Sequence, residues 1–141
     1  MAINGFFNEF RFLSNFWPAP IEVDGIHYPS VEHAYQAMKT FDSKERKLVA
    51  AQPTPRLAKH TGYLVQKRPD WDEVRVSVME DLLRLKFQNP ELRSALVMTH
   101  PHYLEETNTW GDVFWGVCDG KGENHLGMLL MQIREENLHV S

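Results

Sequence analysis

The chain has 141 residues, of which 43% are hydrophobic and 24% are charged, and its formal net charge is −4. This length predicts a single domain over residues 1–141, because two domains of half this size would each lack a sufficient core. The excess of acidic over basic residues excludes a broad basic groove for nucleic acid, although it is compatible with a local basic pocket. The single cysteine, Cys118, excludes a disulfide framework and a thiolate zinc cluster.

Signals for membranes, export and metals are weak in this sequence. No apolar run approaches the roughly 18 residues of a membrane span. The first residues lack the basic segment and uninterrupted apolar core of a signal peptide. The seven histidines do not have the ligand spacing of a common metal site, so neither a metal nor another cofactor is expected. We therefore expect a soluble, cytoplasmic protein with no membrane partner and no stable protein partner.

The N-terminal part combines an aromatic segment with a predicted hairpin. Six of the 16 aromatic residues lie within the first 17 positions, interleaved with polar groups. Residues 20–28 alternate between apolar and polar side chains on both sides of Asp24 and Gly25. An Asp-Gly pair between two alternating runs is typical of a tight β-hairpin.

Helices are predicted over most of the remaining chain. Capping residues followed by apolar residues at helical spacing indicate helices over 31–40 after Ser30, 43–51 after Asp42, 55–61 after Thr54, 71–88 after Asp70, and 91–98.

The C-terminal part predicts two short strands, around 103–106 and 113–117, followed by a Gly-rich loop over 119–124. Asn124 is expected to cap a final amphipathic helix. The predicted fold class is therefore α+β, mainly helical, with a small β-sheet.

The predicted helix 31–40 contains the most informative polar group. Glu32, Gln36 and Lys39 follow one another at helical spacing and therefore share one face. One interpretation is a solvated face with a weak Glu–Lys network. The other is a carboxylate, an amide and an ammonium that line one wall of a cleft. Spacing alone favours the solvated face, because such charges are common on exposed helices.

Two further positions carry an aromatic ring beside a carboxylate. Trp71 follows Asp70 at the start of the longest helix, where it either covers the helix terminus or stacks on a nucleobase. Asp112 lies between Trp110 and Trp115. It is either a turn residue or a carboxylate whose pKa a semi-apolar pocket adjusts.

The loop over 119–124 places Lys121 between two glycines just before a helix N-terminus. Backbone N–H groups at such a terminus bind anions, so the loop is either an ordinary flexible connection or a contact for a pyrophosphate. It matches neither the P-loop nor the dinucleotide-binding motif.

Several strings of this sequence resemble one known family. They are FLSNF at 12–16, DG at 24–25, YPSVEHAYQAMK at 28–39, Trp71, LKF at 85–87, ELR at 91–93, Asp112 with WG at 115–116, GKGEN at 120–124 and LGMLLMQIR at 126–134. Together they resemble the YbiA-like or NADAR family of N-glycosidases, and the resemblance extends from about residue 6 to residue 135. The E-H-x-x-Q-A-x-K element and the terminal L-G-x-L-L-M-x-I-R string are the most specific parts.

The resemblance implies hydrolysis of an N-glycosidic bond between ribose and a base-like nitrogen. Members of the family act on phosphoribosylamino-pyrimidine intermediates of riboflavin synthesis, and related ones remove ADP-ribose from guanine bases. The implied partner is thus a small nucleotide-type substrate, or nucleic acid that carries ADP-ribose. The functional Glu, Trp and Asp of the family correspond to Glu32, Trp71 and Asp112. The sequence departs from the family after Gly116, which makes Asp119 a rival to Asp112.

The implied chemistry suits these residue types, because loss of the base builds positive charge on the ribose. Glu32 would stabilise that cation or activate water, and Asp112 would orient the ribose or the water. Trp71 would stack on the base or the ribose. Lys39 would either pair with phosphate or attack C1 of the ring-opened ribose as a Schiff-base amine.

Further residues are expected to bind the substrate. Ser14 and Asn15 would donate hydrogen bonds to ribose or phosphate, beside Phe16, and Gln36 would complete the wall of the site. Cations for phosphate would come from Lys86, Lys121 and Arg134, although Arg134 also suits a helix C-terminus. Trp115 and Asn124 complete the expected ligand-binding set.

Two alternatives stay open from sequence. A non-catalytic module that binds ADP-ribose or a related nucleotide would use the same pocket. A helical interaction protein would instead carry Glu32, Gln36 and Lys39 on a wet surface.

Overall fold

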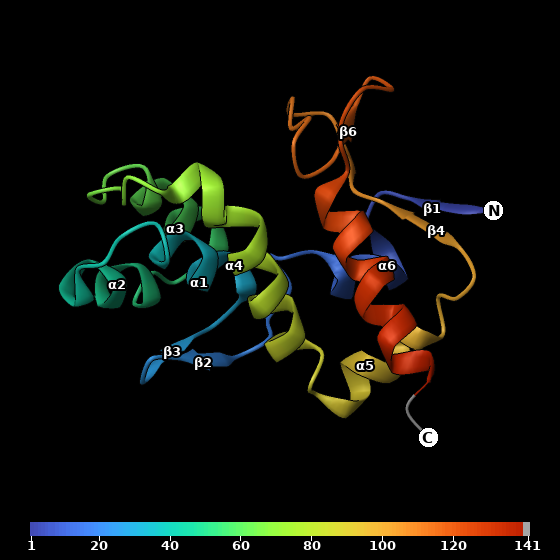
Figure 1. Cartoon of the computed structure of the whole chain (residues 1–141), viewed down its shortest axis with the longest axis horizontal. Helices are drawn as coiled ribbons and strands as arrows, with labels where there is room; N and C mark the ends of the chain where they lie inside the picture. Colours follow the sequence, from blue (N-terminus) through green and yellow to red (C-terminus); the bar gives the residue numbers. More distant parts are fainter. Residues whose placement is uncertain (140–141) are drawn as a thin grey trace. The chain divides into compact units, whose positions relative to one another are not determined.

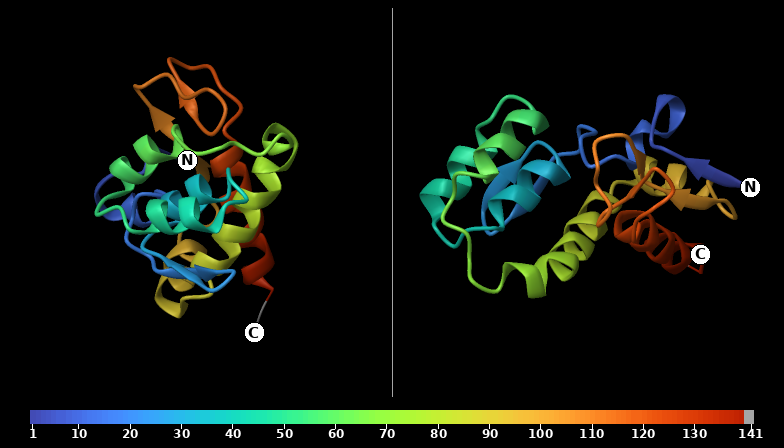
Figure 2. Two further views of the ribbon diagram at one scale, coloured as in Figure 1. Left: turned by 90° about the vertical axis from the view of Figure 1, so that its left-hand side faces the viewer. Right: turned by 90° about the horizontal axis from the view of Figure 1, so that it is seen from above.

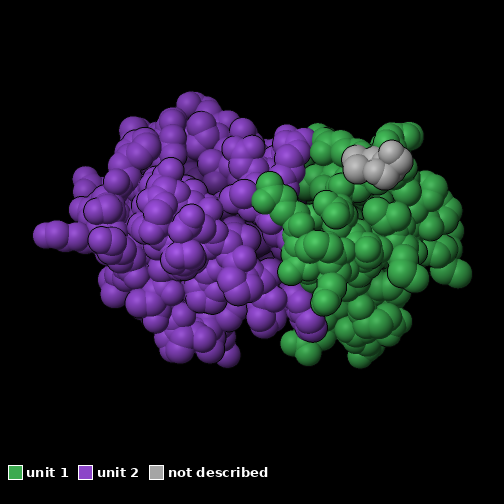
Figure 3. Space-filling view, turned by 90° about the horizontal axis from the view of Figure 1, so that it is seen from below, with its two compact units in different colours: residues 1–14, 87–141 green, residues 15–86 purple. Residues whose placement is uncertain are grey.

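The structure, a computed structural model, describes residues 1–139. Its contacts divide the chain into two units (Figure 3). Residues 15–86 form the first, which we call the helical unit, and residues 1–14 with the segment from Phe87 onwards form the second, the terminal unit. A division by contacts does not define independently folding domains, so the expectation of a single domain over 1–141 stays a prediction. Residues 140–141 of that range lie outside the described part.

The helical unit contains a hairpin and four helices. Its elements are β2 Ile21–Val23, β3 Ile26–Tyr28, α1 Val31–Ala37, α2 Ser43–Ala50, α3 Pro55–Gly62 and α4 Trp71–Lys86. The predicted hairpin is confirmed, with β2 and β3 antiparallel. Its two turn residues, Asp24 and Gly25, both adopt positive φ angles, of 51° and 79°. That conformation is the one that a two-residue hairpin turn requires.

Helix α1 is the central element of the helical unit. It packs against α2, α3 and α4 (Figures 1 and 2), and every residue from 31 to 38 is buried. Ser30 caps its start as predicted, because its side chain accepts a hydrogen bond from the His33 N–H. The helix ends at Ala37, three residues earlier than predicted. A helix buried on all sides leaves little room for a solvated polar face.

The other predicted caps are partly confirmed. Asp42 and Thr54 accept hydrogen bonds from the first turns of α2 and α3. The carboxylate of Asp70, predicted to cap α4, instead binds the guanidinium of Arg68 at 2.6 and 2.9 Å. The charged guanidinium of Arg68, two residues away, is a stronger hydrogen-bond donor to this carboxylate than a backbone N–H.

The terminal unit contains two further helices, one 3-10 helix and two short parallel strand pairs. Its elements are β1 Ala2–Asn4, the 3-10 helix η1 Asn8–Leu13, α5 Pro90–Val97, β4 Tyr103–Glu105, β5 Thr107–Asn108, β6 Val117–Cys118 and α6 His125–Leu138. Strand β1 pairs in parallel with β4, and β5 pairs in parallel with β6. Buried apolar residues of α5, α6 and β4 form its interior: Leu96, Leu104, Leu126, Leu129, Leu130 and Ile133.

The structure corrects the strand predictions in this unit. The predicted strand 113–117 is wrong except at its end, because residues 114–116 form a bend and only Val117 of this range belongs to β6. Strand β1 and the 3-10 helix were not predicted. The expected small sheet consists, within residues 1–139, of three separate two-stranded sheets. The mainly helical α+β class is confirmed. In the same range, no helix combines the length and apolar composition needed to cross a membrane.

Candidate active site

Glu32 lies in the first turn of α1, a position where the helix dipole favours a carboxylate. Its side chain is buried, and the residue is only 8% exposed. Its backbone N–H donates to the carbonyl of Asn15 at 3.1 Å, so Asn15 is held at the start of the helix. The interpretation of Glu32, Gln36 and Lys39 as a solvated face is therefore wrong. A buried carboxylate costs free energy unless other groups compensate it.

Gln36 supplies one compensating group, since its Nε2 donates to Glu32 Oε2 at 2.8 Å. A carboxylate only accepts hydrogen bonds, which fixes the orientation of the Gln36 amide. The Oε1 atom of Gln36 is buried and has no hydrogen-bond partner among residues 1–139. It faces Gly62 of α3, where an added Cβ would overlap Oε1 and Cδ of Gln36. The Gln36 amide thus occupies the space that a side chain at position 62 would need.

Lys39 follows α1 and is half-buried. Its Nζ lies 5.2 Å from the ring centroid of Tyr63, just after α3. Burial lowers the pKa of Lys39, the charge of Glu32 opposes this shift, and the charges of Lys67 and Lys59 add to it. A lysine with a lowered pKa has a larger fraction of free amine near neutrality, which is what a nucleophilic amine needs.

Trp71 is the first residue of α4 and is buried, with 3% of its surface exposed. Its ring lies 5.1 Å from that of Tyr35 at an interplanar angle of 54°. Tyr35 follows Glu32 by one turn on α1, so the indole packs beside the helix that carries the carboxylate. The ring thus already has an aromatic neighbour within the protein. Its stacking on a substrate stays a prediction.

Asn15 also belongs to the helical unit, together with the more exposed Phe16. The side-chain Nδ2 of Asn15 donates to Sδ of Met79 at 3.4 Å. Its Oδ1 is buried and has no hydrogen-bond partner in the described chain. The unused atom is therefore an acceptor, whereas the sequence suggested a donor. Ser14 lies in the terminal unit, where its N–H closes the 3-10 helix by donating to Arg11.

The helical unit also contains two buried basic residues, each near the end of a helix. Lys86, the last residue of α4, is 2% exposed, and burial lowers its pKa to about 7. His33 lies next to Glu32 and is 1% exposed. Its ring nitrogens lie 2.7 Å from Ser30 Oγ and 2.9 Å from the carbonyl of Gln52. Because a carbonyl only accepts, Nε2 carries the proton, and burial lowers the pKa of this imidazole.

Asp112 lies in the terminal unit and is half-buried. Its Oδ1 accepts hydrogen bonds from the N–H groups of Phe114 and Trp115, at 3.1 and 2.9 Å. The side chain of Asn108 binds the Asp112 backbone twice: its Nδ2 donates to the Asp112 carbonyl, and its Oδ1 accepts from the Asp112 N–H. The same Nδ2 also donates to Glu106 Oε2 at 3.0 Å. Asp112 is thus a turn residue, one of the two interpretations of the sequence. Its second carboxylate oxygen is available for a further contact, and Glu106 is a neighbouring carboxylate that the sequence did not reveal.

The remaining predicted residues of the terminal unit have different surroundings. Lys121 is exposed, and so is Asp119, which adopts a positive φ of 52° in the loop. Asn124 is buried and does not cap α6 with its side chain. Its amide instead donates to the Leu104 carbonyl and accepts from the Glu106 N–H, at 2.9 and 3.0 Å. The Trp115 ring packs edge-on against Phe114, with centroids 4.9 Å apart.

Arg134, on α6, is buried and makes its hydrogen bonds inside the terminal unit. Its guanidinium donates to Thr99 Oγ1 and to the His102 carbonyl, at 3.0 and 2.7 Å.

The structure therefore brings one predicted group together within a single unit: Glu32, Gln36 and Lys39, with Trp71 and Asn15 beside the same helix. Sequence reasoning missed Tyr35, Gly62 and Tyr63, which complete this group from α1 and α3. No sequence signal marks them, because their contacts join residues of different elements. Asp112, Trp115, Lys121 and Asn124 belong to the terminal unit. No group of three or more His, Cys, Asp or Glu side chains in residues 1–139 is arranged to hold a metal.

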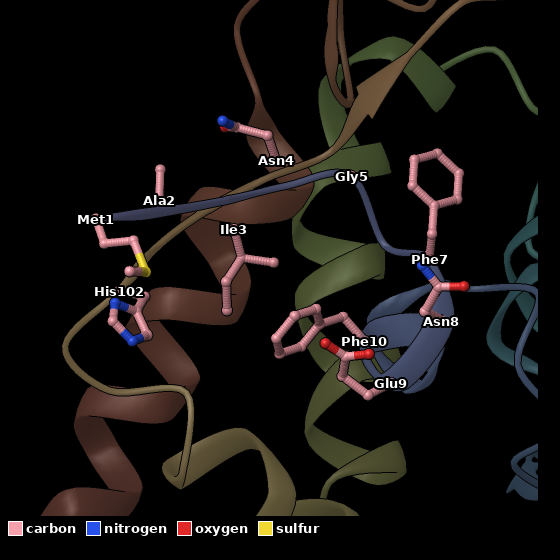
Figure 4. A pocket seen from close by; sticks show the side chains of 10 residues that line it. All are labelled: Met1, Ala2, Ile3, Asn4, Gly5, Phe7, Asn8, Glu9, Phe10 and His102. Atoms are coloured by element: carbon pink, nitrogen blue, oxygen red, sulfur yellow. The ribbon is translucent and has the colours of Figure 1, made fainter.

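A hollow of about 310 Å³ lies elsewhere in the terminal unit (Figure 4). Strand β1 borders it, together with the start of the 3-10 helix and the side chain of His102. None of the predicted site residues lines it.

Comparison with known proteins gives consistent matches over nearly the whole chain. Residues 5–138 match the NADAR domain. N-glycosidase YbiA of Escherichia coli is 41% identical over 133 residues, which cover 92% of this chain and 82% of that protein. An N-glycosidase of Nostoc punctiforme is 38% identical, with 87% and 83% covered. A riboflavin biosynthesis protein of Vibrio vulnificus is 41% identical over 129 residues, but the chain spans only 35% of it.

The fold also matches a solved structure. The NMR structure of E. coli YbiA superposes with a TM-score of 0.85 at 36% identity, covering 100% of this chain and 88% of that one.

Proposed function

Because the chain belongs to the NADAR domain family and is a hydrolase of N-glycosyl bonds, we propose that it cleaves the bond between ribose and a base nitrogen in a nucleotide-type substrate. The substrate classes that we propose are ADP-ribose attached to guanine and a phosphoribosylamino-pyrimidine intermediate of riboflavin synthesis. The name of the Vibrio vulnificus relative supports the second class.

One observation carries this proposal: a buried carboxylate, Glu32, is held by a neutral amide and lies within the electrostatic reach of a lysine. Burial of a carboxylate costs free energy, so the buried position of Glu32 supports a functional role for it. Positive charge that develops on ribose during loss of the base would be stabilised by such a group, since charges interact more strongly away from water.

Glu32 is assigned the central role in this mechanism. Its carboxylate stabilises the oxocarbenium-like ribose or removes a proton from the attacking water. Gln36 holds one carboxylate oxygen through its Nε2, which helps to orient the carboxylate. Trp71 stacks on the base or ribose. That Asp112 orients the ribose or the water, as expected from the sequence, stays a prediction. The half-exposed carboxylate of Asp112 retains one oxygen for that contact, which supports its role.

Lys39 has two possible roles in the proposal. As an ammonium it pairs with a phosphate of the substrate. As a free amine it attacks C1 of the ring-opened ribose, which is joined to the base nitrogen as an imine. The bond from C1 to that nitrogen breaks, the base leaves as its amine, and one water later hydrolyses the Schiff base between C1 and Lys39 to release the ribose. Its lowered pKa supports the second role.

The test is release of free base from three substrates offered side by side: ADP-ribosylated guanine, NAD and a phosphoribosylamino-pyrimidine. Chromatography of the products separates base from ribosylated material. We expect hydrolysis of at least one substrate. The absence of base release from all three would contradict the proposal.

Glu32→Gln tests the central assignment. We expect the variant to lose about 10²–10⁴-fold in kcat, because the amide carries no charge and cannot act as a base. Glu22→Gln is the matched control, since Glu22 lies on the exposed side of the hairpin. Full activity in Glu32→Gln, or an equal loss in both variants, would contradict the role of Glu32.

A further inference from the structure

Three lysines interact through their charges at the edge of this site, and one of them lies over the exposed ring of Tyr63. Lys39 lies with its Nζ over the ring. Lys59 precedes Tyr63 by four residues along α3, so the two residues share one face of that helix and its end. Lys67 lies in the segment between α3 and α4. Its neighbour Arg68 donates its backbone N–H to the Lys39 carbonyl at 2.6 Å, which brings this segment next to Lys39.

The positive charge of this lysine cluster, Lys39, Lys59 and Lys67, is only partly offset by the charge of Glu32, which acts on Lys39. Lys39 and Lys59 form no ion pair within residues 1–139, and Lys67 reaches only the exposed carboxylate of Asp72, at 3.9 Å. The charges of Lys59 and Lys67 both act on the Lys39 ammonium. Gathering three cations in a chain of net charge −4 is unfavourable unless an anion joins them.

The exposed ring between these cations adds a second type of contact. Tyr63 is 69% exposed, although aromatic rings usually gain stability by burial. Its neighbour Gly62 contacts Gln36, which binds Glu32. The cluster is therefore linked by direct contacts to the proposed catalytic carboxylate.

We propose that Lys59 and Lys67, beside Lys39 and Tyr63, form the subsite for a phosphate group of the substrate. This inference rests on the proposed function and adds a location to it. It differs from the expectation for Lys86, which is buried at the end of α4. The subsite explains how a chain with an acidic balance holds an anionic nucleotide.

The kinetic test uses Lys59→Gln and Lys67→Gln with a substrate that carries the phosphate and with its dephosphorylated nucleoside form. We expect each variant to raise KM for the phosphorylated substrate by about two- to fivefold, as loss of one partly exposed charge contact should. KM for the nucleoside form should not change. Lys47→Gln, which removes an exposed lysine of α2, is the matched control. Unchanged KM values for the phosphorylated substrate, or equal increases for both substrates, would overturn the subsite.

A second measurement does not depend on activity. Inorganic pyrophosphate is titrated into the wild-type protein while the backbone amide signals of Gly62 and Tyr63 are followed by NMR. We expect saturable shifts that are weakened in Lys59→Gln and Lys67→Gln and retained in Lys47→Gln. Saturable shifts without hydrolysis of any substrate would support the subsite and contradict the proposed function. The absence of shifts at Gly62 and Tyr63 would overturn the subsite even if hydrolysis is observed.

Discussion

At the scale of single residues, the site depends on how burial changes the properties of charged groups. Glu32 is buried beside a neutral amide, and Lys39 is half-buried beside two other lysines. The sequence places these residues on one helical face, but their environments come from other elements. Lys39 illustrates this, since its pKa responds to the charges of Lys59 on α3 and of Lys67 in the following segment.

Borohydride trapping tests the amine role of Lys39. We expect reduction in the presence of substrate to leave a stable adduct in the wild-type protein and none in Lys39→Ala, as mass spectrometry of the peptide would show. Because only the free amine reacts, adduct formation should increase as the pH rises through the lowered pKa of Lys39.

The lysine cluster provides the control for that pH dependence. Removing the positive charge of Lys67 should raise the pKa of Lys39 toward its ordinary value, which moves the increase to higher pH in Lys67→Gln. Lys47→Gln should leave the pH dependence unchanged. An adduct that persists in Lys39→Ala would assign the amine to another residue.

At the scale of elements, the close approach of α1 and α3 orients the catalytic group. Gly62 is the last residue of α3, and the Gln36 side chain lies where a Cβ at position 62 would be. In the sequence, Gly62 directly follows the predicted helix 55–61. In the structure Gly62 lies inside the helix. A side chain there would collide with Gln36 of the neighbouring helix α1, so the reason for a glycine is visible only in the packing of the two helices.

Gly62→Ala therefore separates activity from stability. Alanine is favoured over glycine in a helix by up to about 1 kcal/mol, so the helix itself is not weakened. The added Cβ should displace the Gln36 amide from Glu32 and lower kcat by about 10- to 100-fold, because a small misplacement of a catalytic group is costly. Steady-state kinetics and urea unfolding of the same variant measure the two effects.

A double-mutant cycle identifies the path of this effect. If Gly62 acts through Gln36, Gly62→Ala should cost little additional kcat in a Gln36→Ala background. His60→Ala, at an exposed position of α3, is the control. Additive losses would mean that Gly62 does not act through Gln36.

At the scale of the whole molecule, the fold stability includes a pH-dependent contribution from His33. Burial lowers the pKa of His33 below its ordinary value of 6.5, with the Gln52 carbonyl partly opposing the shift. The unfolded chain therefore binds a proton at a higher pH than the folded protein does. This contribution to stability is fully present above about pH 6.5 and is lost as the pH falls toward the lowered pKa of the folded state.

Urea unfolding at about pH 7.5 and about pH 5.5 tests this linkage. We expect the free energy of unfolding to decrease at the lower pH in the wild-type protein and to decrease less in His33→Asn. His27→Gln, at an exposed position of β3, should behave like the wild type. NMR titration of the His33 ring provides a readout in the unmodified protein, and an ordinary or raised pKa there would contradict the prediction.

The sequence by itself determined the local features of this protein. Ser30, Asp42 and Thr54 predicted helix starts correctly, because a cap depends on residues only two or three positions away. The Asp24-Gly25 turn was predictable for the same reason. The family was also evident from the strings along the chain, and the match over residues 5–138 confirms it.

The tertiary structure decided what local patterns leave open. Parallel pairing of β1 with β4 joins residues about a hundred positions apart, so no short-range signal predicts it. Spacing favoured a solvated face for Glu32 and Gln36, but the packing of α1 against three other helices buries both residues. Burial is a property of the surrounding elements rather than of the helix itself. The chemistry of the site therefore follows from contacts between elements, whereas the helix that carries it was readable from the sequence.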